Sequence, residues 1–276
     1  MSDLYLTIAE QPDTVLQAIA SSMDDRINDP NMQAICADYM GRLPGPGKTV
    51  LEVGCGNGAS TEMLLAVARP SSLLGVDPAR GLLERAKDRF KEQAHVKFEP
   101  GDAVDTGQDD ACFDIVLAHT VYSHLADPKS ALKEAFRVLK PGGTLAIFDG
   151  DYATNTVALF DGDPLQAAME AAQRNLIHDL FIMRRLPRLM AEAGFETPTT
   201  KAHGFIQTDR PDYMRSLMAR GAQTGHLAGE FGPEMAAAFQ AEANRRIDGG
   251  SFYGAILFVS AIARKPHAGP GDDAEA

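Results

Sequence analysis

The chain has 276 residues, 45% of them hydrophobic, which suits one large α/β domain or a core domain with an attached cap. Its net charge of −12 argues against nucleic acid as the main substrate, because phosphate backbones are bound by Lys and Arg clusters and only isolated basic pairs occur here. No apolar run is long enough to span a bilayer and the first residues lack a signal-peptide pattern, so we expect a cytoplasmic protein without a membrane partner.

The first part of the chain is predicted to form a helical arm, residues 1–44. Apolar residues recur at helical spacing over residues 12–42, and Asp29-Pro30 interrupts them, so we expect two helices with a turn between them. A segment rich in Gly and Pro follows and marks the entry into the core.

A strand, a glycine turn and a helix start are predicted next, over residues 49–66. Glycine lets the backbone adopt φ > 0 and lets a ligand approach closely, and a helix N-terminus offers free N–H groups. A nucleotide-like cofactor is therefore expected. Gly54-x-Gly56-x-x-Ala59 also satisfies the relaxed dinucleotide fingerprint, although the carboxylate of Glu52 would repel a pyrophosphate.

The core then alternates between strands and helices. This alternation predicts a parallel sheet covered on both faces, with ligands bound at the carboxyl ends of the strands. The glycine turn, Asp77 and Asp102 all fall at such ends. The expected strands are 49–53, 72–76, 95–99, 113–118 and 144–149, and the expected helices are 58–68, 79–93 and 128–139.

Beyond residue 150 the pattern becomes mainly helical, and we expect helical caps or insertions over 151–200 and 209–252. A pocket lid and a packing or dimer surface are equally compatible with the second insertion. The small, polar and acidic tail, residues 265–276, is predicted to be disordered. The expected elements are helices over 163–193, 211–221 and 233–247, and strands over 202–207 and 254–263.

The core motifs resemble those of class I S-adenosylmethionine (SAM)-dependent methyltransferases, closest to the small-molecule group similar to ubiquinone and menaquinone methyltransferases. The resemblance covers residues 45–150 well and implies a Rossmann-like, mostly parallel seven-stranded sheet in a methyltransferase domain over 45–264, with SAM as cofactor. It rests on Leu51-Glu52-Val53-Gly54-Cys55-Gly56-Asn57-Gly58, Gly75-Val76-Asp77-Pro78, Gly101-Asp102-Ala103, Phe113-Asp114-Ile115-Val116 and Arg137-Val138-Leu139-Lys140-Pro141-Gly142-Gly143.

The resemblance implies that the first two strand ends bind the ribose and the methionine part of SAM. Asp77, followed by Pro78, would hold both ribose hydroxyls. It could also cap the next helix, and the two roles are compatible. Gly54, Gly56 and Gly58 would line the methionine part.

Further cofactor contacts are implied at other positions. Asp102 would accept from the adenine amino group, and the Ala103 N–H would meet a ring nitrogen. Glu52 would position the turn or bind the cofactor amino group through water, or else be satisfied by local backbone N–H groups. His119 would face cofactor or substrate, or be a strand-end residue that touches neither. Arg26 would pair with the cofactor carboxylate if the arm folds over it, and is otherwise a surface arginine.

Two residues are candidates for proton transfer. His124 can take a proton near neutral pH, and Asp149 follows the fifth strand. A structural His124 bonded to a carbonyl and a loop-capping Asp149 are the alternatives, since alignment of an acceptor with the methyl group does not require a base. The three cysteines show no metal-ligand spacing, and no metal is expected.

The sequence therefore predicts an enzyme that transfers a methyl group from SAM to O, N or C of a small-molecule acceptor by in-line displacement. A nicotinamide-dependent oxidoreductase and a non-catalytic cofactor-binding protein of the same fold are the alternatives. No acceptor signature and no oligomeric state can be read beyond residue 150.

Overall fold

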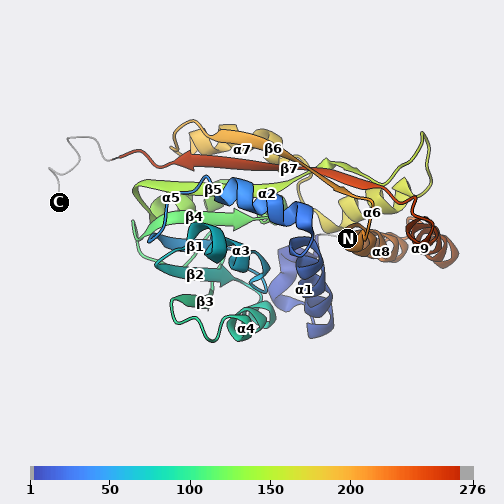
Figure 1. Cartoon of the computed structure of the whole chain (residues 1–276), viewed down its shortest axis with the longest axis horizontal. Helices are drawn as coiled ribbons and strands as arrows, with labels where there is room; N and C mark the ends of the chain where they lie inside the picture. Colours follow the sequence, from blue (N-terminus) through green and yellow to red (C-terminus); the bar gives the residue numbers. More distant parts are fainter. Residues whose placement is uncertain (1–2, 268–276) are drawn as a thin grey trace.

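The computed structural model describes residues 3–267 and contains a seven-stranded sheet in the order β3-β2-β1-β4-β5-β7-β6 (Figure 1). Strand β7 runs antiparallel to its neighbours β5 and β6, and the pairs from β3 to β5 are all parallel. The predicted Rossmann-like, mostly parallel sheet is thus confirmed. The strands are β1 (Thr49–Val53), β2 (Ser72–Asp77), β3 (Val96–Pro100), β4 (Phe113–His119), β5 (Leu139–Thr156), β6 (Thr199–Gln207) and β7 (Gly254–Arg264).

Helices cover both faces of the sheet, because successive strand residues point to opposite sides. Val50 belongs to the hydrophobic cluster that includes α2 and α3, whereas Leu51 belongs to the cluster that includes α5 and α7. The helices are η1 (Leu4–Glu10), α1 (Asp13–Ile27), α2 (Pro30–Met40), α3 (Ala59–Ala68), α4 (Arg80–Arg89), η2 (Tyr122–His124), α5 (Pro128–Val138), α6 (Gln166–Leu176), α7 (Ile182–Glu192), α8 (Asp212–Leu227) and α9 (Pro233–Asp248), where η marks a 3-10 helix.

The two arm helices form as predicted, with the break at Asp29-Pro30. The Asp29 side chain caps α2 by accepting from the Asn31 N–H (2.8 Å), and Pro30 occupies the first turn, where no N–H is needed. The 3-10 helix η1, which precedes α1, was not predicted. Its capping residue Asp3 accepts from the Tyr5 N–H.

Strand β5 is much longer than the predicted strand 144–149. Its pairing with β4 jumps from Leu139 to Thr144, so the Pro and Gly residues between them form an irregular segment inside the strand. At the other end, pairing with β7 carries β5 past the end of β4 as far as Thr156. Tertiary pairing, which local sequence does not reveal, sets both ends.

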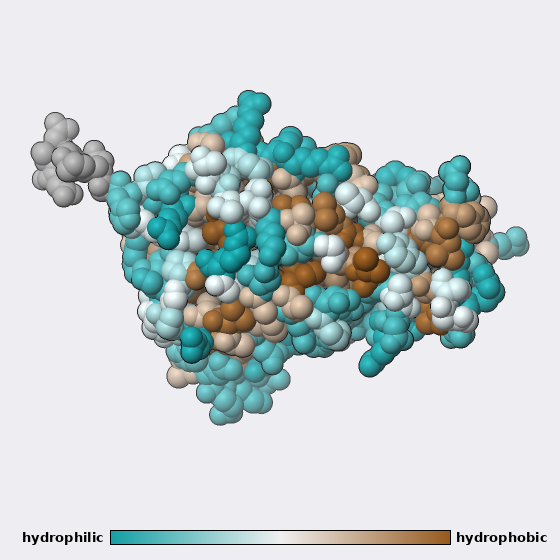
Figure 2. Space-filling model, turned by 45° about the horizontal axis from the view of Figure 1, so that its top comes forward, coloured by the Kyte–Doolittle hydropathy of each residue, from teal (hydrophilic) through white to brown (hydrophobic). Residues whose placement is uncertain are grey.

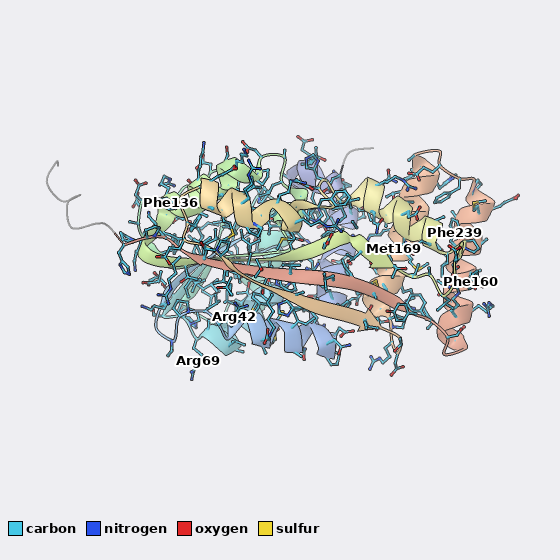
Figure 3. The ribbon with its side chains drawn as sticks, turned by 90° about the horizontal axis from the view of Figure 1, so that it is seen from above. Arg42, Arg69, Phe136, Phe160, Met169 and Phe239 are labelled. Carbon is cyan, nitrogen blue, oxygen red and sulfur yellow. The ribbon has the colours of Figure 1, made fainter. Side chains whose placement is uncertain are left out.

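Four helices gather at the end of the sheet toward which the parallel strands point. Figure 1 shows α1, α6, α8 and α9 at this end. Met169 on α6 and Phe239 on α9 lie at the same end in Figure 3 and belong to one hydrophobic cluster. Figure 2 shows a largely hydrophilic face on which hydrophobic residues gather over the middle and toward these helices. Helices α8 and α9 lie between β6 and β7, within the predicted insertion 209–252.

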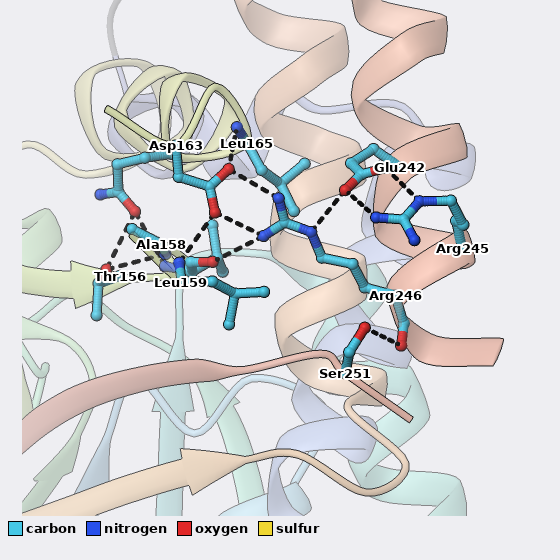
Figure 4. A network of polar contacts seen from close by, with 11 residues as sticks. Thr156, Ala158, Leu159, Asp163, Leu165, Glu242, Arg245, Arg246 and Ser251 are labelled. Carbon is cyan, nitrogen blue, oxygen red and sulfur yellow. Dashed lines mark hydrogen bonds and ion pairs between the residues drawn. The ribbon is translucent and has the colours of Figure 1, made fainter. Parts of the chain in front are cut away.

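A buried ion pair fixes α9 to the segment that follows β5 (Figure 4). The guanidinium of Arg246 donates to both carboxylate oxygens of Asp163, at 2.7 and 2.8 Å, and both residues are only 4% exposed. Asp163 also accepts the backbone N–H groups of Leu159 and Leu165. The insertion is therefore tied to the core by a fully paired buried charge.

Two further predictions concern regions at the limits of the described chain. The tail predicted to be disordered, 265–276, lies outside the described residues from 268 onward. None of the helices in residues 3–267 combines the length and apolar character needed to cross a bilayer.

Candidate active site

The glycine turn after β1 has a backbone that only glycine accommodates easily. Gly54, Gly56 and Gly58 have φ values of 66°, 54° and 77°. A Cβ on Gly54 would lie 2.5 Å from a methyl carbon of Val121, and one on Gly56 would lie 2.9 Å from the sulfur of Met23. A Cβ on Gly58 would instead strike the Phe90 ring, 2.7 Å away, so Gly58 faces the packed core.

Asp77, at the end of β2, joins the glycine turn to the next helix. One carboxylate oxygen accepts from the Gly56 N–H (2.9 Å), and the other accepts from the Ala79 N–H (2.8 Å). Burial raises the pKa of Asp77 to about 6, although these two N–H groups oppose the shift. The predicted helix-capping role is not observed, because the N-cap of α4 is Ala79 and α4 has no side-chain cap; Asp77 instead ties the glycine turn to Ala79. Each oxygen keeps a lone pair that can accept a further hydrogen bond.

Glu52, within β1, is fully buried beside the start of α3. Its oxygens accept from the hydroxyls of Ser60 (2.6 Å) and Thr61 (2.5 Å) at the start of α3. Side-chain hydroxyls thus satisfy this carboxylate, in place of the backbone N–H groups considered from the sequence. Burial raises the pKa of Glu52 to about 7.

Glu52 is expected to make the parent less stable as pH rises. Its pKa is higher in the folded chain (about 7) than its ordinary value of 4.5. Its favourable contribution is therefore complete below about pH 4.5 and is lost as pH rises toward 7, a change of about 3 kcal/mol. Urea denaturation at pH 5 and pH 8 should show that Glu52→Gln removes this pH dependence. Glu62→Gln, at an exposed position on α3, should keep the pH dependence. If the unfolding free energy changed equally with pH in the parent and in Glu52→Gln, the assignment of this dependence to Glu52 would be contradicted.

Residues from three strand ends line one cleft of about 100 Å³. They include Gly54 after β1, Asp77 and Pro78 after β2, and Asp102 and Ala103 after β3. Asp102 is exposed, and its carboxylate accepts from the Val104 N–H (3.0 Å), which holds the loop in a tight turn. Five predicted cofactor-binding residues thus meet at the carboxyl edge of the sheet.

A smaller hollow of about 30 Å³ adjoins the glycine turn and contains two more predicted residues, His119 and Arg26. His119 Nδ1 forms a 2.7 Å hydrogen bond with the Tyr39 hydroxyl, while Nε2 is buried without a partner in the described chain. Burial lowers the pKa of His119 well below its usual range, so the ring is neutral. Arg26 donates to the Thr120 hydroxyl (2.8 Å), and Thr120 has a strained φ of 56°.

His124 faces the cleft from η2 and is held by the start of the chain. Its Nδ1 lies 2.7 Å from a carboxylate oxygen of Asp3, and its ring lies 4.1 Å from that of Tyr5. Asp149 lies behind it and is fully buried. Its oxygens accept from the backbone N–H and hydroxyl of Ser123 and from the Gly150 N–H. Asp149 therefore ties η2 to β5 and lines neither of the two hollows described above.

The arm, here η1 and α1, covers the site. Met23 lies over Gly56, and Asn57 in the turn donates to the Ala20 carbonyl and to Asp24 of α1. The hollows of about 100 and 30 Å³ are smaller than the roughly 300–1,000 Å³ of pockets that hold drug-sized ligands. We therefore expect the arm to shift when a nucleoside cofactor binds.

Sequence reasoning missed several residues of this site. Tyr39 bonds to His119 across 80 positions, and Asp3 bonds to His124 across 121. Neither partner carries a local motif, so no signal in the sequence pointed to them. Thr120 was not predicted either, because a positive φ at a threonine has no sequence signature.

Comparison with known proteins identifies the family of this fold and site. The model of a methyltransferase domain matches residues 51–147. The demethylmenaquinone methyltransferase of Lactococcus lactis is 33% identical over 175 residues, which cover 57% of this chain and 69% of that enzyme. The chain belongs to the class I SAM-dependent methyltransferases.

The chain is also similar to methyltransferases that it matches over only part of their length. The 27-O-demethylrifamycin SV methyltransferase of Amycolatopsis mediterranei is 37% identical over 113 residues, 40% of this chain and 41% of that protein. The chain spans less than two thirds of the length of several curated relatives that it matches. Phosphoethanolamine N-methyltransferase 2 of Haemonchus contortus, solved with S-adenosylhomocysteine (SAH), shares the fold at a TM-score of 0.59 and 17% identity, covering 95% of this chain and 59% of that one.

Proposed function

We propose that the chain transfers a methyl group from SAM to a small-molecule acceptor. The observation that carries the proposal is the meeting of three strand ends in one cleft, with Gly54, Asp77, Pro78, Asp102 and Ala103 in its wall. In a parallel sheet this edge is where nucleotide-like ligands bind. The family match supports the same cofactor.

The residues present fit the cofactor. Gly54 and Gly56, both with positive φ, leave room where a Cβ would clash. Two buried nitrogen atoms, Nε of Arg26 and Nε2 of His119, lack partners within residues 3–267. Asp77 would accept from the ribose hydroxyls, Asp102 and Ala103 would contact the adenine, and Arg26 would pair with the carboxylate. When bound, SAM supplies an electrophilic methyl group on its sulfonium.

The chain itself would contribute alignment and exclusion of water. The arm closes over the cleft through Met23 and through the Asp3–His124 contact, and these contacts would hold the acceptor in line with the methyl group. His124 would take a proton from an acceptor hydroxyl. For Asp149 we propose a positioning role, because its carboxylate accepts from the Ser123 N–H and hydroxyl of η2 and from the Gly150 N–H of β5.

Calorimetric titration of the purified chain with SAM, SAH and NADH tests the proposal. Micromolar binding of SAM and SAH without binding of NADH is expected. NADH binding alone would favour a nicotinamide-dependent oxidoreductase and overturn the proposal. Binding of SAM without turnover on any acceptor would favour a non-catalytic protein of this fold.

Replacing His124 by Asn is expected to separate its two roles. Loss of a general base lowers kcat by roughly 10²–10⁴-fold and leaves the affinity for SAH unchanged. Loss of the arm contact alone would instead weaken SAH binding, and Asp3→Asn would then have the same effect, because Asp3 is the partner of His124. Steady-state kinetics beside SAH calorimetry on both variants decides between them.

We also propose a cytoplasmic location and no nucleic-acid partner. All three cysteines are free, which suits a reducing compartment, and the net charge of −12 opposes binding to phosphate backbones. Separation of cell extracts into soluble and membrane fractions, with an antibody to the chain, tests the location.

A further inference from the structure

A third hollow lies directly beside the cofactor cleft. Its volume is about 40 Å³, and Tyr5, Met23, Thr120 and His124 line both hollows. A molecule held there would be next to the carboxyl end of β4. Because Tyr5, Ser22 and Met23 belong to the arm, the arm shift that admits the cofactor also widens this hollow.

Positive charge gathers in this hollow without a matching acid. The guanidinium groups of Arg26 and Arg220 both line it, and no Asp or Glu does. Arg220 Nη2 donates to the Ser22 hydroxyl (3.1 Å), and its Nε is buried without a partner in the part of the chain that the structure describes. Neither arginine forms an ion pair with a carboxylate of residues 3–267.

The acid that contacts His124 of this hollow is already engaged. The carboxylate of Asp3 holds His124 Nδ1 and the N–H groups of Tyr5 and His178. Both arginines are only half-buried as residues, but the Nε of each is fully buried and has no acceptor in the described chain. A buried donor without an acceptor is costly, so an anion that accepts from it would stabilise the arrangement. Binding sites commonly hold such uncompensated groups at the expense of stability.

The two arginines differ in what they face. Arg26 also lines the hollow beside Gly54 and His119, which fits its proposed contact with the cofactor carboxylate. Arg220 lines only the third hollow among those around the site, and it comes from α8 in the insertion between β6 and β7. Apolar side chains, Leu176, Ile177 and Leu217, complete its surroundings.

We propose that Arg220 binds an anionic group, a carboxylate or a phosphate, of the methyl acceptor. This inference rests on the proposed methyl transfer and narrows the acceptor to a small molecule with an anionic group on an apolar body. Guanidinium groups suit both anions because their donors form a planar fork. The Tyr5, Tyr152 and Tyr213 residues of the hollow supply apolar ring surface beside it.

Binding of three probes to the full chain saturated with SAH tests the inference. Benzoate and phenyl phosphate carry the two anions on one aromatic body, and benzyl alcohol is their neutral counterpart. Calorimetry is expected to show binding of at least one anion and none of the alcohol, and the stronger anion identifies the group. Equal binding of the alcohol, or no binding of either anion, overturns the inference. Because SAH binding is measured first, failure of the proposed cofactor site is recognised separately.

Matched variants on α8 locate the contact. Arg220→Gln should weaken anion binding roughly tenfold or more, since a charge-assisted hydrogen bond is lost. Arg215→Gln, whose side chain is 54% exposed and paired with Asp212, should leave it unchanged. Arg220→Met, without ligand, should melt at the same or a higher temperature than the parent. A lower melting temperature or unchanged anion binding would make Arg220 a structural residue and overturn the proposal.

Discussion

Replacing Asp77 by alanine is expected to weaken SAH binding at least about a hundredfold. The carboxylate would accept from two ribose hydroxyls while it holds the Gly56 and Ala79 N–H groups, so one substitution removes ligand contacts and loosens the glycine turn. Hydrogen bonds to a charged group are worth about 1.5–3 kcal/mol each, and two of them account for this loss of affinity. Calorimetric titration with SAH measures it.

Two further measurements separate ligand contact from misfolding. Asp77→Asn keeps the volume and one acceptor oxygen, so it should fold like the parent and still bind SAH weakly, whereas Asp109→Ala at an exposed position should bind like the parent. Because the pKa of Asp77 is about 6, parent affinity should also fall as pH drops below 6. Parent-like affinity of Asp77→Ala would show that the cofactor lies elsewhere.

Asp163→Ala is expected to lower the free energy of unfolding by about 3–5 kcal/mol. The substitution leaves Arg246, which is 4% exposed, with a buried charge whose only remaining carboxylate partner among the described residues is Glu242. Chemical denaturation of the parent and the variant measures the difference. The double substitution Asp163→Leu with Arg246→Met should recover only part of the loss. It removes the unpaired charge, but the Leu159 and Leu165 N–H groups still lack their acceptor.

A control and a pH series sharpen this prediction. Arg245→Ala, at a side chain that is 69% exposed and contacts the same Glu242, should change stability by less than about 0.5 kcal/mol. Hydrogen bonds from Arg246 lower the pKa of Asp163 to about 2. The contribution of Asp163 is therefore complete above about pH 4 and lost as pH falls toward 2. A parent and Asp163→Ala that respond alike to pH would contradict this account.

Sequence patterns predicted the elements of the fold well because those elements follow from local periodicity and capping. The break at Asp29-Pro30 and the alternation of strands and helices are of this kind. The predicted ends of β5 were wrong because the first depends on pairing with β4 and the second on pairing with β7, whose residues are distant in the sequence. The 3-10 helix η1 was missed because contacts of Asp3 with Tyr5, His124 and His178 stabilise it.

The cofactor side of the site was easier to predict than the acceptor side. Gly54, Asp77 and Asp102 fall at strand ends, and topology alone brings strand ends together. The proposed acceptor side is assembled from elements far apart in the sequence, and α1 and α8 contribute three residues each at helical spacing. Local periodicity shows such a helix face but does not show which other elements it meets. Arg220 lies in a helix whose sequence carries no motif, and only its missing counter-ion in the described structure draws attention to it.

The arm that lies over Gly56 has a consequence for the order of events in a catalytic cycle. Because Tyr5 and Met23 line both the cofactor cleft and the hollow that Arg220 lines, one displacement of the arm would open both at once. Products would then leave only at the rate at which the arm detaches from Asn57 and His124. Steady-state turnover would report this release step, and a burst of methylated product in the first cycle would be its kinetic signature.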